Sequence, residues 1–296
     1  MPRPQLIHTY ALPTPAAGPY ALTAGPDGAL WCTLVHAGRI ARLGPDGRID
    51  EFPLDSPDCG PTLITPGPDG ALWFTRNRDH RIGRITPDGE ARSHAVPGSA
   101  PGPYGITAGP DGAVWFTTLN TATVTRLTPD GELTEHALPN GSFPSFVTTA
   151  ADGALWCTLN QGNALARITV AGETTLHPLP TPGAAPVGLA AAPDGTLWFA
   201  EIGTGRIGRL TPGGITEHPL PDPGCRPHAV AVAPDGSCWY TAWATGRIGR
   251  VTPDGTVTEF PLPTPACEPH GLAFAPDGTL YVAQETGEIT RWAVAP

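Results

Sequence analysis

The chain has 296 residues, including 37 glycines and 38 prolines, and a net charge of −10. Its 17 basic residues are spread thinly and form no basic stripe, so the composition argues against nucleic acid as a partner. No stretch approaches the roughly 18 apolar residues of a membrane helix, and the N-terminal residues Met-Pro-Arg-Pro-Gln-Leu-Ile-His lack an apolar run suited to secretion. We therefore expect a soluble, cytoplasmic protein.

An internal repeat of about 42 residues dominates the sequence. The aspartate of a recurring Pro-Asp-Gly-like turn marks each copy, and successive copies are 41 or 42 residues apart: Asp27, Asp69, Asp111, Asp152, Asp194, Asp235 and Asp277. Tryptophan and branched aliphatic residues fall at fixed places between these turns. Periodic turns separated by short apolar runs predict many short strands rather than helices.

The first expected strand, residues 7–13, aligns with residues 215–221, which end the fifth copy. The seventh copy stops before its own last strand, at Pro296. We therefore expect the N-terminal segment to pair as the outer strand of the last copy. That pairing would close the ring and leave no inner sheet edge open, which makes a monomer the simplest expectation.

The sixth copy illustrates the four strands expected in each repeat, at residues 229–233, 237–241, 247–251 and 257–260. Proline presets φ for a turn and glycine accepts positive φ, so Pro-Asp-Gly separates strands for a physical reason. Four strands per copy of this length are typical of a propeller blade. The sequence thus predicts an all-β fold, a seven-bladed β-propeller formed by residues 1–296 as one domain.

The six cysteines contain no CxxC pair, so the spacing of a zinc site is absent. Cys32 and Cys157 share a position in the second strand and are expected to be buried. Cys59, Cys225 and Cys267 share a loop position between blades. Without a signal peptide, reduced thiols are expected.

Most histidines have a structural explanation. Four of them share one fourth-strand position: His94, His136, His177 and His218. In the other blades this position holds Tyr10, Phe52 and Phe260, so the four imidazoles are expected to pack there as aromatic rings do. His36 and His80 lie in turns between the second and third strands and are expected to be solvated.

His228 and His270 break the pattern, because each follows the proline that begins an inner strand. The other residues at this position, where inner strands meet one rim of the channel, are Tyr20, Thr62, Tyr104, Ser145 and Val187. Of the seven residues that come just before these prolines, only Arg226 and Glu268 are charged. In the loop after the second strand, Glu285 is the charged residue, so the four polar exceptions that face one side of the channel are His228, Glu268, His270 and Glu285. Polar exceptions converging on one concavity predict a functional site.

The residue types at this rim suggest particular chemistry. Two glutamates suit Mg²⁺, which often takes one or two protein carboxylates and completes its shell with water or substrate oxygens. An imidazole with an ordinary pKa of about 6.5 is a usable base near neutral pH. No Gly-x-Ser-x-Gly elbow or phosphate loop is present. The combination favours proton abstraction next to a carbonyl over nucleophilic attack.

Over its whole length the sequence resembles the virginiamycin B lyase (streptogramin B lyase) family. The specific features are Arg226-Pro227-His228-Ala229, Glu268-Pro269-His270-Gly271 and Glu285 in Ala283-Gln284-Glu285-Thr286-Gly287. The resemblance implies His270 as the general base, His228 as a substrate-binding residue, and Glu268 and Glu285 as magnesium ligands. It implies a cyclic depsipeptide substrate, opened by elimination of its ester.

Tyr20, Tyr104 and Trp243 lie at or near the expected rim and are candidates for contact with an apolar depsipeptide. Two alternatives stay open at this point. A calcium-dependent propeller lactonase would need more carboxylate or asparagine ligands around the channel than the sequence offers. A non-catalytic binding propeller would use the two histidines as ligand contacts.

Overall fold

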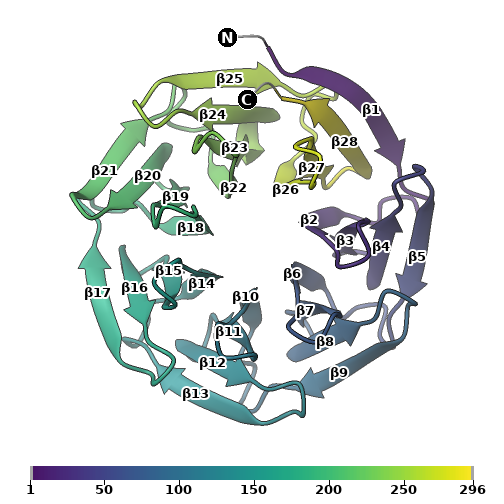
Figure 1. Cartoon of the computed structure of the whole chain (residues 1–296), viewed down its shortest axis with the longest axis horizontal. Helices are drawn as coiled ribbons and strands as arrows, with labels where there is room; N and C mark the ends of the chain where they lie inside the picture. Colours follow the sequence, from purple (N-terminus) through teal and green to yellow (C-terminus); the bar gives the residue numbers. More distant parts are fainter. Residues whose placement is uncertain (1–2, 295–296) are drawn as a thin grey trace.

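The computed structural model describes residues 3–294. Its strands form seven four-stranded sheets, arranged as blades around a central axis (Figure 1). Within residues 3–294 there is no α-helix, and a single 3-10 helix, η1 (Trp243–Thr245), lies in the sixth blade. No helix in this range is long and apolar enough to cross a membrane. The predicted all-β, seven-bladed β-propeller is confirmed.

The inner half of each blade faces the channel and consists of its first two strands. The inner strands are β2 (Pro19–Ala24), β6 (Pro61–Pro66), β10 (Pro103–Ala108), β14 (Pro144–Thr149), β18 (Pro186–Ala191), β22 (Pro227–Val232) and β26 (Pro269–Phe274). The second strands are β3 (Leu30–Leu34), β7 (Leu72–Arg76), β11 (Val114–Thr118), β15 (Leu155–Leu159), β19 (Leu197–Glu201), β23 (Cys238–Ala242) and β27 (Leu280–Gln284). Every residue of the second strands is buried.

The outer half of each blade consists of its third and fourth strands (Figure 1). The third strands are β4 (Arg39–Leu43), β8 (Arg81–Ile85), β12 (Thr123–Leu127), β16 (Ala164–Ile168), β20 (Arg206–Thr211), β24 (Arg247–Val251) and β28 (Glu288–Ala293). The fourth strands are β5 (Ile49–Pro53), β9 (Ala91–Ala95), β13 (Leu133–Ala137), β17 (Thr174–Pro178), β21 (Gly214–Pro219), β25 (Val257–Pro261) and β1 (Gln5–Ala11).

The N-terminal strand closes the ring as predicted. In the last blade the strand order is β1-β28-β27-β26, and β1 pairs antiparallel with β28, with Thr9 opposite Thr290 and Tyr10 opposite Ile289. The register shifts between Leu6 and His8. The seventh blade is therefore assembled from both ends of the described chain.

The predicted strand bounds of the sixth blade were wrong by one or two residues, except for 247–251. β22 begins at Pro227, which stands opposite Ala242, and the register then shifts before Val230. Such a shift is the mark of a β-bulge, which the alternation of apolar residues does not reveal. Ala233, expected to end this strand, instead belongs to the turn, where its N–H donates to Ser237 O at 2.9 Å.

The aspartate of the first turn ties two strands of its blade together. In the first blade, Asp27 accepts hydrogen bonds from Trp31 Nε1 at 3.0 Å and from Arg42 Nε at 2.6 Å. Burial opposes ionisation, but the bonds from Trp31 and Arg42 hold the pKa of Asp27 below its ordinary value. The residue that shapes the turn thus also anchors the second and third strands.

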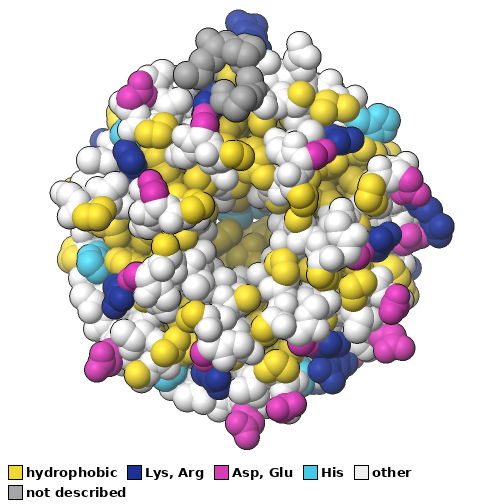
Figure 2. All heavy atoms as spheres, viewed as in Figure 1, with side chains coloured by type: hydrophobic (Ala, Val, Ile, Leu, Met, Phe, Trp, Pro, Cys, Tyr) yellow, Lys and Arg dark blue, Asp and Glu magenta, His cyan; other side chains and the backbone are white. Residues whose placement is uncertain are grey.

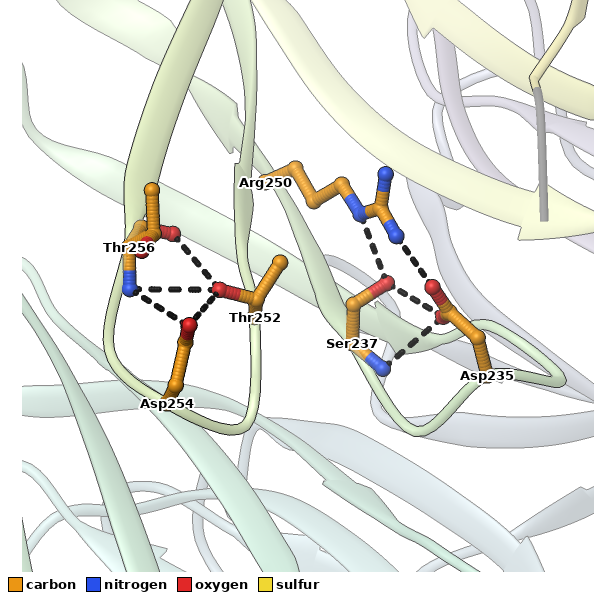
Figure 3. A network of polar contacts seen from close by, with 6 residues as sticks. All are labelled: Asp235, Ser237, Arg250, Thr252, Asp254 and Thr256. Atoms are coloured by element: carbon orange, nitrogen blue, oxygen red, sulfur yellow. Dashed lines mark hydrogen bonds and ion pairs between the residues drawn. The ribbon is translucent and has the colours of Figure 1, made fainter. Parts of the chain in front are cut away.

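The sixth blade shows a variant of this arrangement (Figure 3). Arg250 pairs with Asp235 and donates from Nε to Ser237 Oγ at 3.0 Å, and that hydroxyl donates to Asp235 at 2.6 Å. In the second turn of the blade, Asp254 accepts a hydrogen bond from the backbone N–H of Thr256 at 3.1 Å. Both Pro-Asp-Gly turns are therefore closed by their own aspartates.

The histidines expected to pack in the fourth strands do so. His94 stacks on the fully buried Trp73 with ring centroids 5.7 Å apart, and His136 stacks on Trp115 at 5.3 Å. The same pairing recurs in Trp156–His177 and Trp198–His218. These imidazoles take the place of the phenylalanine that packs on the tryptophan in the first and sixth blades.

Threonines of the second strands join neighbouring blades near the channel rim. Thr75 Oγ1 donates to Tyr104 O at 2.7 Å, and Thr241 Oγ1 donates to His270 O at 2.9 Å. The same hydroxyl of Thr241 accepts from the N–H of Ala229 in its own blade at 3.0 Å. One side chain thus fixes the backbone of the next blade at the ring position where His270 stands.

The channel contains a cavity of about 220 Å³. Its wall is formed by all seven inner strands, and most of the lining side chains are aliphatic, including Leu22, Ile64, Ile106, Val147, Leu189, Val230 and Leu272. Figure 2 shows the hollow at the centre of one face, surrounded by hydrophobic side chains, with histidine visible inside it. The histidines that line the cavity are His228 and His270.

All six cysteines are buried and free. Burial raises the pKa of the Cys59 thiol to about 11 and that of Cys225 to about 12. The thiols are therefore neutral at physiological pH and behave as small apolar side chains.

Candidate active site

Four predicted rim residues meet at the cavity, and three of them line it: Tyr20, His228 and His270. Tyr20 stacks on His270 with ring centroids 4.5 Å apart, and His270 meets His228 edge-on at 4.8 Å. The hydroxyls of Tyr20 and Tyr104 lie 2.6 Å apart, although the two residues are 84 positions apart in sequence. Tyr104 Oη also lies 3.5 Å from His228 Nε2. Side chains from blades 1, 3, 6 and 7 thus form one continuous surface, named the aromatic layer below.

In this layer the backbone of blade 7 at Gly271 lies close to the backbone of blade 1 at Tyr20. A side chain at Gly271, the residue after His270, would put its Cβ 2.5 Å from Tyr20 O. Such a distance is sterically forbidden, so glycine is required there. This contact brings the Tyr20 and His270 rings within stacking distance.

Burial sets the protonation states of the aromatic layer. It lowers the pKa of His228 to about 3, and the neighbouring His270 acts in the same direction. It raises the pKa of Tyr104 to about 12 and holds that of Tyr20 well above its ordinary value. At neutral pH the layer therefore offers a neutral imidazole and two phenol hydroxyls, which can orient a polar group without adding charge.

Glu285 lies beside the layer, on the loop after β27, and its carboxylate contacts two imidazoles. Oε2 pairs with His270 Nε2, and Oε1 lies 2.7 Å from His36 Nε2. The contact with His270 lowers the pKa of Glu285 despite the opposing effect of partial burial. An N–H at Nε2 leaves the lone pair of His270 on Nδ1, which is buried and has no hydrogen-bond partner among residues 3–294.

His36 is solvated as expected, but its contact with the candidate site was not predicted. Its side chain is 42% exposed, as expected of a turn residue, but its ring nitrogen is bound to Glu285. The two residues are 249 positions apart and meet only because the ring closes between blades 7 and 1. A histidine at a variable turn position gives no signal of such a contact.

Glu268 precedes β26 in the left-handed backbone region, with φ of 49°. Its carbonyl oxygen accepts the N–H of Glu285 at 3.1 Å, so the two glutamates stand on adjoining main chains. The side chain is exposed, and its carboxylate forms no hydrogen bond or ion pair within residues 3–294. Phe143, Ala185 and Arg226 share this conformation at the equivalent positions of blades 4 to 6, so it belongs to the repeat rather than to the site.

These two carboxylates fit a weakly ligated, hard cation. Both donors are oxygens, Glu285 is ionised at neutral pH, and Glu268 has no competing partner in the described chain. In that part of the chain no group of three or more His, Cys, Asp or Glu side chains is arranged to hold a metal. The donor set therefore suits Mg²⁺ completed by water or substrate oxygens, and does not suit a structural zinc site.

Trp243 borders the site from the sixth blade. Its ring centroid lies 6.0 Å from that of His270, and the Arg226 guanidinium lies over it at 5.5 Å. The indole Nε1 is buried without a hydrogen-bond partner among the described residues. Trp243 thus belongs to the same rim as the aromatic layer, as predicted.

Phe146 was missed by the sequence reasoning. Its ring meets His228 and Tyr104 edge-on, each with centroids 5.8 Å apart. A signal existed, because the equivalent residues of the other blades are aliphatic or glycine: Ala21, Leu63, Gly105, Gly188, Ala229 and Gly271. Comparing this second rim position across blades would have singled out the one aromatic.

The comparisons with known proteins agree with this arrangement. Residues 5–292 match the model of the virginiamycin B lyase family. A virginiamycin B lyase of Mycobacterium sp. (strain KMS) is 69% identical over 39 residues, a match that spans 13% of this chain and only 14% of that protein.

Two solved structures are similar over nearly the whole chain. Selenomethionine-substituted virginiamycin B lyase from Staphylococcus aureus is 40% identical, with a TM-score of 0.94, covering 99% of this chain and 100% of that one. Catalytically inactive H270A virginiamycin B lyase from Staphylococcus aureus with quinupristin is 39% identical, with the same TM-score and coverage. The family match, which covers nearly all of the described residues, places this chain in the virginiamycin B lyase family.

Proposed function

We propose that the protein is a streptogramin B lyase, which linearises cyclic depsipeptide antibiotics by elimination at their ester linkage. The observation that carries the proposal is the pairing of His270 with the ionised Glu285 beside the aromatic layer. Membership of the virginiamycin B lyase family supports it. So does the similar S. aureus protein, whose inactive variant lacks a histidine and was crystallised with quinupristin.

His270 acts as the general base in the proposed reaction. It takes the α-proton of the threonine residue whose side-chain oxygen carries the ester. The electrons of that C–H bond form a carbon–carbon double bond, the Cβ–O bond breaks, and the carboxylate leaves. The product is a linear peptide ending in a free carboxylate and containing dehydrobutyrine, and no water is consumed.

Glu285 assists this step through its contact with the base. Once protonated, the His270 imidazolium would be buried and positively charged, which is costly without a partner. The ionised carboxylate at Nε2 offsets that charge. The same carboxylate fixes the ring orientation, as a carboxylate does for the histidine of a catalytic triad.

The aromatic layer binds the depsipeptide. His228 and the hydroxyls of Tyr20 and Tyr104 are neutral and can exchange hydrogen bonds with amide or ester groups. Trp243 offers an apolar face and an indole N–H without a partner in the described chain. A ring-shaped, largely apolar substrate matches this mixture of flat surfaces and few polar groups.

Glu268 and Glu285 are the residues that would hold Mg²⁺. A cation held by them would stabilise negative charge on substrate oxygens. Glu285 would then serve both the cation and His270, which its two oxygens and their several lone pairs permit.

Product mass tests the reaction type. The purified protein is incubated with a streptogramin B and Mg²⁺, and the products are followed by mass spectrometry. Elimination opens the ring without a change in mass, whereas hydrolysis by a lactonase adds one water. No turnover, as expected of a binding propeller, would refute the lyase assignment.

Two further measurements test the parts. Removal of the metal with EDTA should abolish turnover, and added Mg²⁺ should restore it. Full activity in EDTA would refute the metal requirement.

His270→Ala should lower kcat at least 100-fold, in line with typical contributions of general bases of roughly 10²–10⁴. His8→Ala, on the exposed outer strand, is the matched control and should retain activity.

A further inference from the structure

The Glu285 carboxylate is held from two sides. From the buried side, Oε2 faces His270, whose side chain is 11% exposed. From the solvent side, Oε1 faces His36 Nε2 at 2.7 Å. His36 belongs to blade 1 and takes no part in the aromatic layer, so its contact with the site passes through Glu285.

The position of His36 is fixed by its own blade. Its backbone N–H donates to Ala17 O at 3.0 Å. Its ring lies against Gly18, where any Cβ would collide with the imidazole and where φ is 68°. Glycine at this point therefore leaves room for the ring, which reaches Glu285 of the neighbouring blade while its side chain stays 42% exposed.

Blades 2 and 3 carry other side chains at the position of His36, and neither makes the same contact. Arg78 occupies the equivalent place in blade 2, where it lies against Gly60, and Asn120 does so in blade 3 against Gly102. Asn120 binds the backbone oxygen of Ala100. Within the described residues, neither side chain contacts a carboxylate of the candidate site.

We propose that His36 is a positioning residue, which holds the Glu285 carboxylate in the orientation that serves both His270 and a divalent cation. This inference rests on the proposed function, since it concerns the same carboxylate. A hydrogen bond to one oxygen leaves further lone pairs for a cation. Outer partners of ligating groups typically change metal affinity by roughly 10- to 100-fold when removed.

The test uses Mn²⁺ as the probe, titrated into the metal-free, full-length protein and followed by calorimetry and electron paramagnetic resonance. His36→Ala should weaken Mn²⁺ binding about tenfold. His36→Gln keeps an N–H donor and should recover most of that loss. Arg78→Ala, the matched change in blade 2, should bind Mn²⁺ as the wild type does. Thermal unfolding of each variant verifies that it is folded.

The outcomes separate this inference from the proposed function. Wild-type affinity in His36→Ala would overturn the positioning role and leave the metal site intact. Equal losses in His36→Ala and His36→Gln would also overturn it, because the hydrogen bond would not be the cause. Absence of Mn²⁺ binding by the wild type would refute the proposed metal site and this inference together.

A double-mutant cycle gives a second readout. In the Glu285→Gln background, the further change His36→Ala should leave kcat/KM for streptogramin B unchanged, because its effect passes through that carboxylate. An additional loss of the same size as in the wild type would mean that His36 acts independently of Glu285, which contradicts the proposal.

Discussion

His228 illustrates how burial decides the behaviour of a single side chain. Its pKa falls to about 3 because burial disfavours the charged imidazole, with the neighbouring His270 adding to the effect. In the unfolded chain the same imidazole would titrate near 6.5. The unfolded state therefore binds a proton that the fold excludes, and stability is lost as the pH falls from 6.5 through 3.

Replacement of His228 by glutamine should remove this source of acid sensitivity. We expect the free energy of unfolding of His228→Gln to fall less between about pH 7 and about pH 4 than that of the wild type, by an amount on the order of a few kcal/mol. Urea unfolding at the two pH values measures it. Parallel losses in both proteins would contradict a buried neutral imidazole.

Residues that break the repeat could be found from the sequence, and residues that meet only through ring closure could not. His228, His270 and Glu285 stand out because blades 1 to 5 carry other side chains at the equivalent positions. His36 does not stand out, because the equivalent turn position holds a different residue in every blade. The contact of Tyr20 with Tyr104 depends on the channel width, which no local pattern encodes.

At the scale of the blade, the stability that a turn aspartate contributes depends on how many side chains donate hydrogen bonds to it. Asp69 accepts from Trp73 Nε1 at 2.9 Å and from Arg84 Nε at 2.6 Å. Asp194 holds the same turn in blade 5 but is bound there by the N–H of Thr196. The indole N–H of that blade, in Trp198, is buried without a partner in the described chain.

The two aspartates thus make a matched pair. Asp69→Ala leaves an indole N–H and a guanidinium without their acceptor and should cost about 1–3 kcal/mol. Asp194→Ala should lower the free energy of unfolding by less, because neither the indole nor the arginine of blade 5 donates a hydrogen bond to Asp194. Chemical denaturation of both variants measures the difference, and equal costs would show that turn geometry alone is responsible.

Blade 5 also contains a buried acid, Glu201 at the end of β19. Burial, followed by the nearby charge of Glu217, raises its pKa from 4.5 to about 7. Oε2 accepts from Thr204 Oγ1 at 3.0 Å, and Oε1 has no partner among the described residues. The fold favours the protonated acid, so the stability that it contributes is present below 4.5 and lost as the pH rises through 7.

Glu201→Gln should therefore stabilise the protein selectively at alkaline pH. We expect a higher Tm than the wild type at about pH 8 and little difference at about pH 5. Glu132→Gln, at an exposed position, is the control and should behave as the wild type at both. A gain that is the same at both pH values would contradict the raised pKa.

The repeat and its turns predict the existence and order of nearly every strand, because Pro-Asp-Gly and the apolar runs act locally. The ends of the inner strands were less predictable. Pro227 joins β22 through a pairing that a register shift separates from the rest of the strand. That shift depends on the neighbouring strand rather than on the residues before or after it.

For the molecule as a whole, β1 is the element that closes the ring. Removal of residues 1–11 should lower Tm by several degrees, because β28 would lose its outer partner and the blade would gain an open edge. A synthetic peptide of residues 5–13 should restore part of the loss by strand addition, whereas a scrambled peptide should not. An unchanged Tm after truncation would contradict the closure.

The order of synthesis gives this closure a further consequence. Of the strands in residues 3–294, β1 emerges from the ribosome first and its partner β28 last. At translation rates of roughly 5–20 residues per second, the first strand waits about 15–60 s for it. The contact between His36 and Glu285 likewise cannot form until the last blade has been synthesised. A nascent or truncated chain can therefore contain most of the blades and still lack the assembled site, so that activity in a cell should report only finished chains.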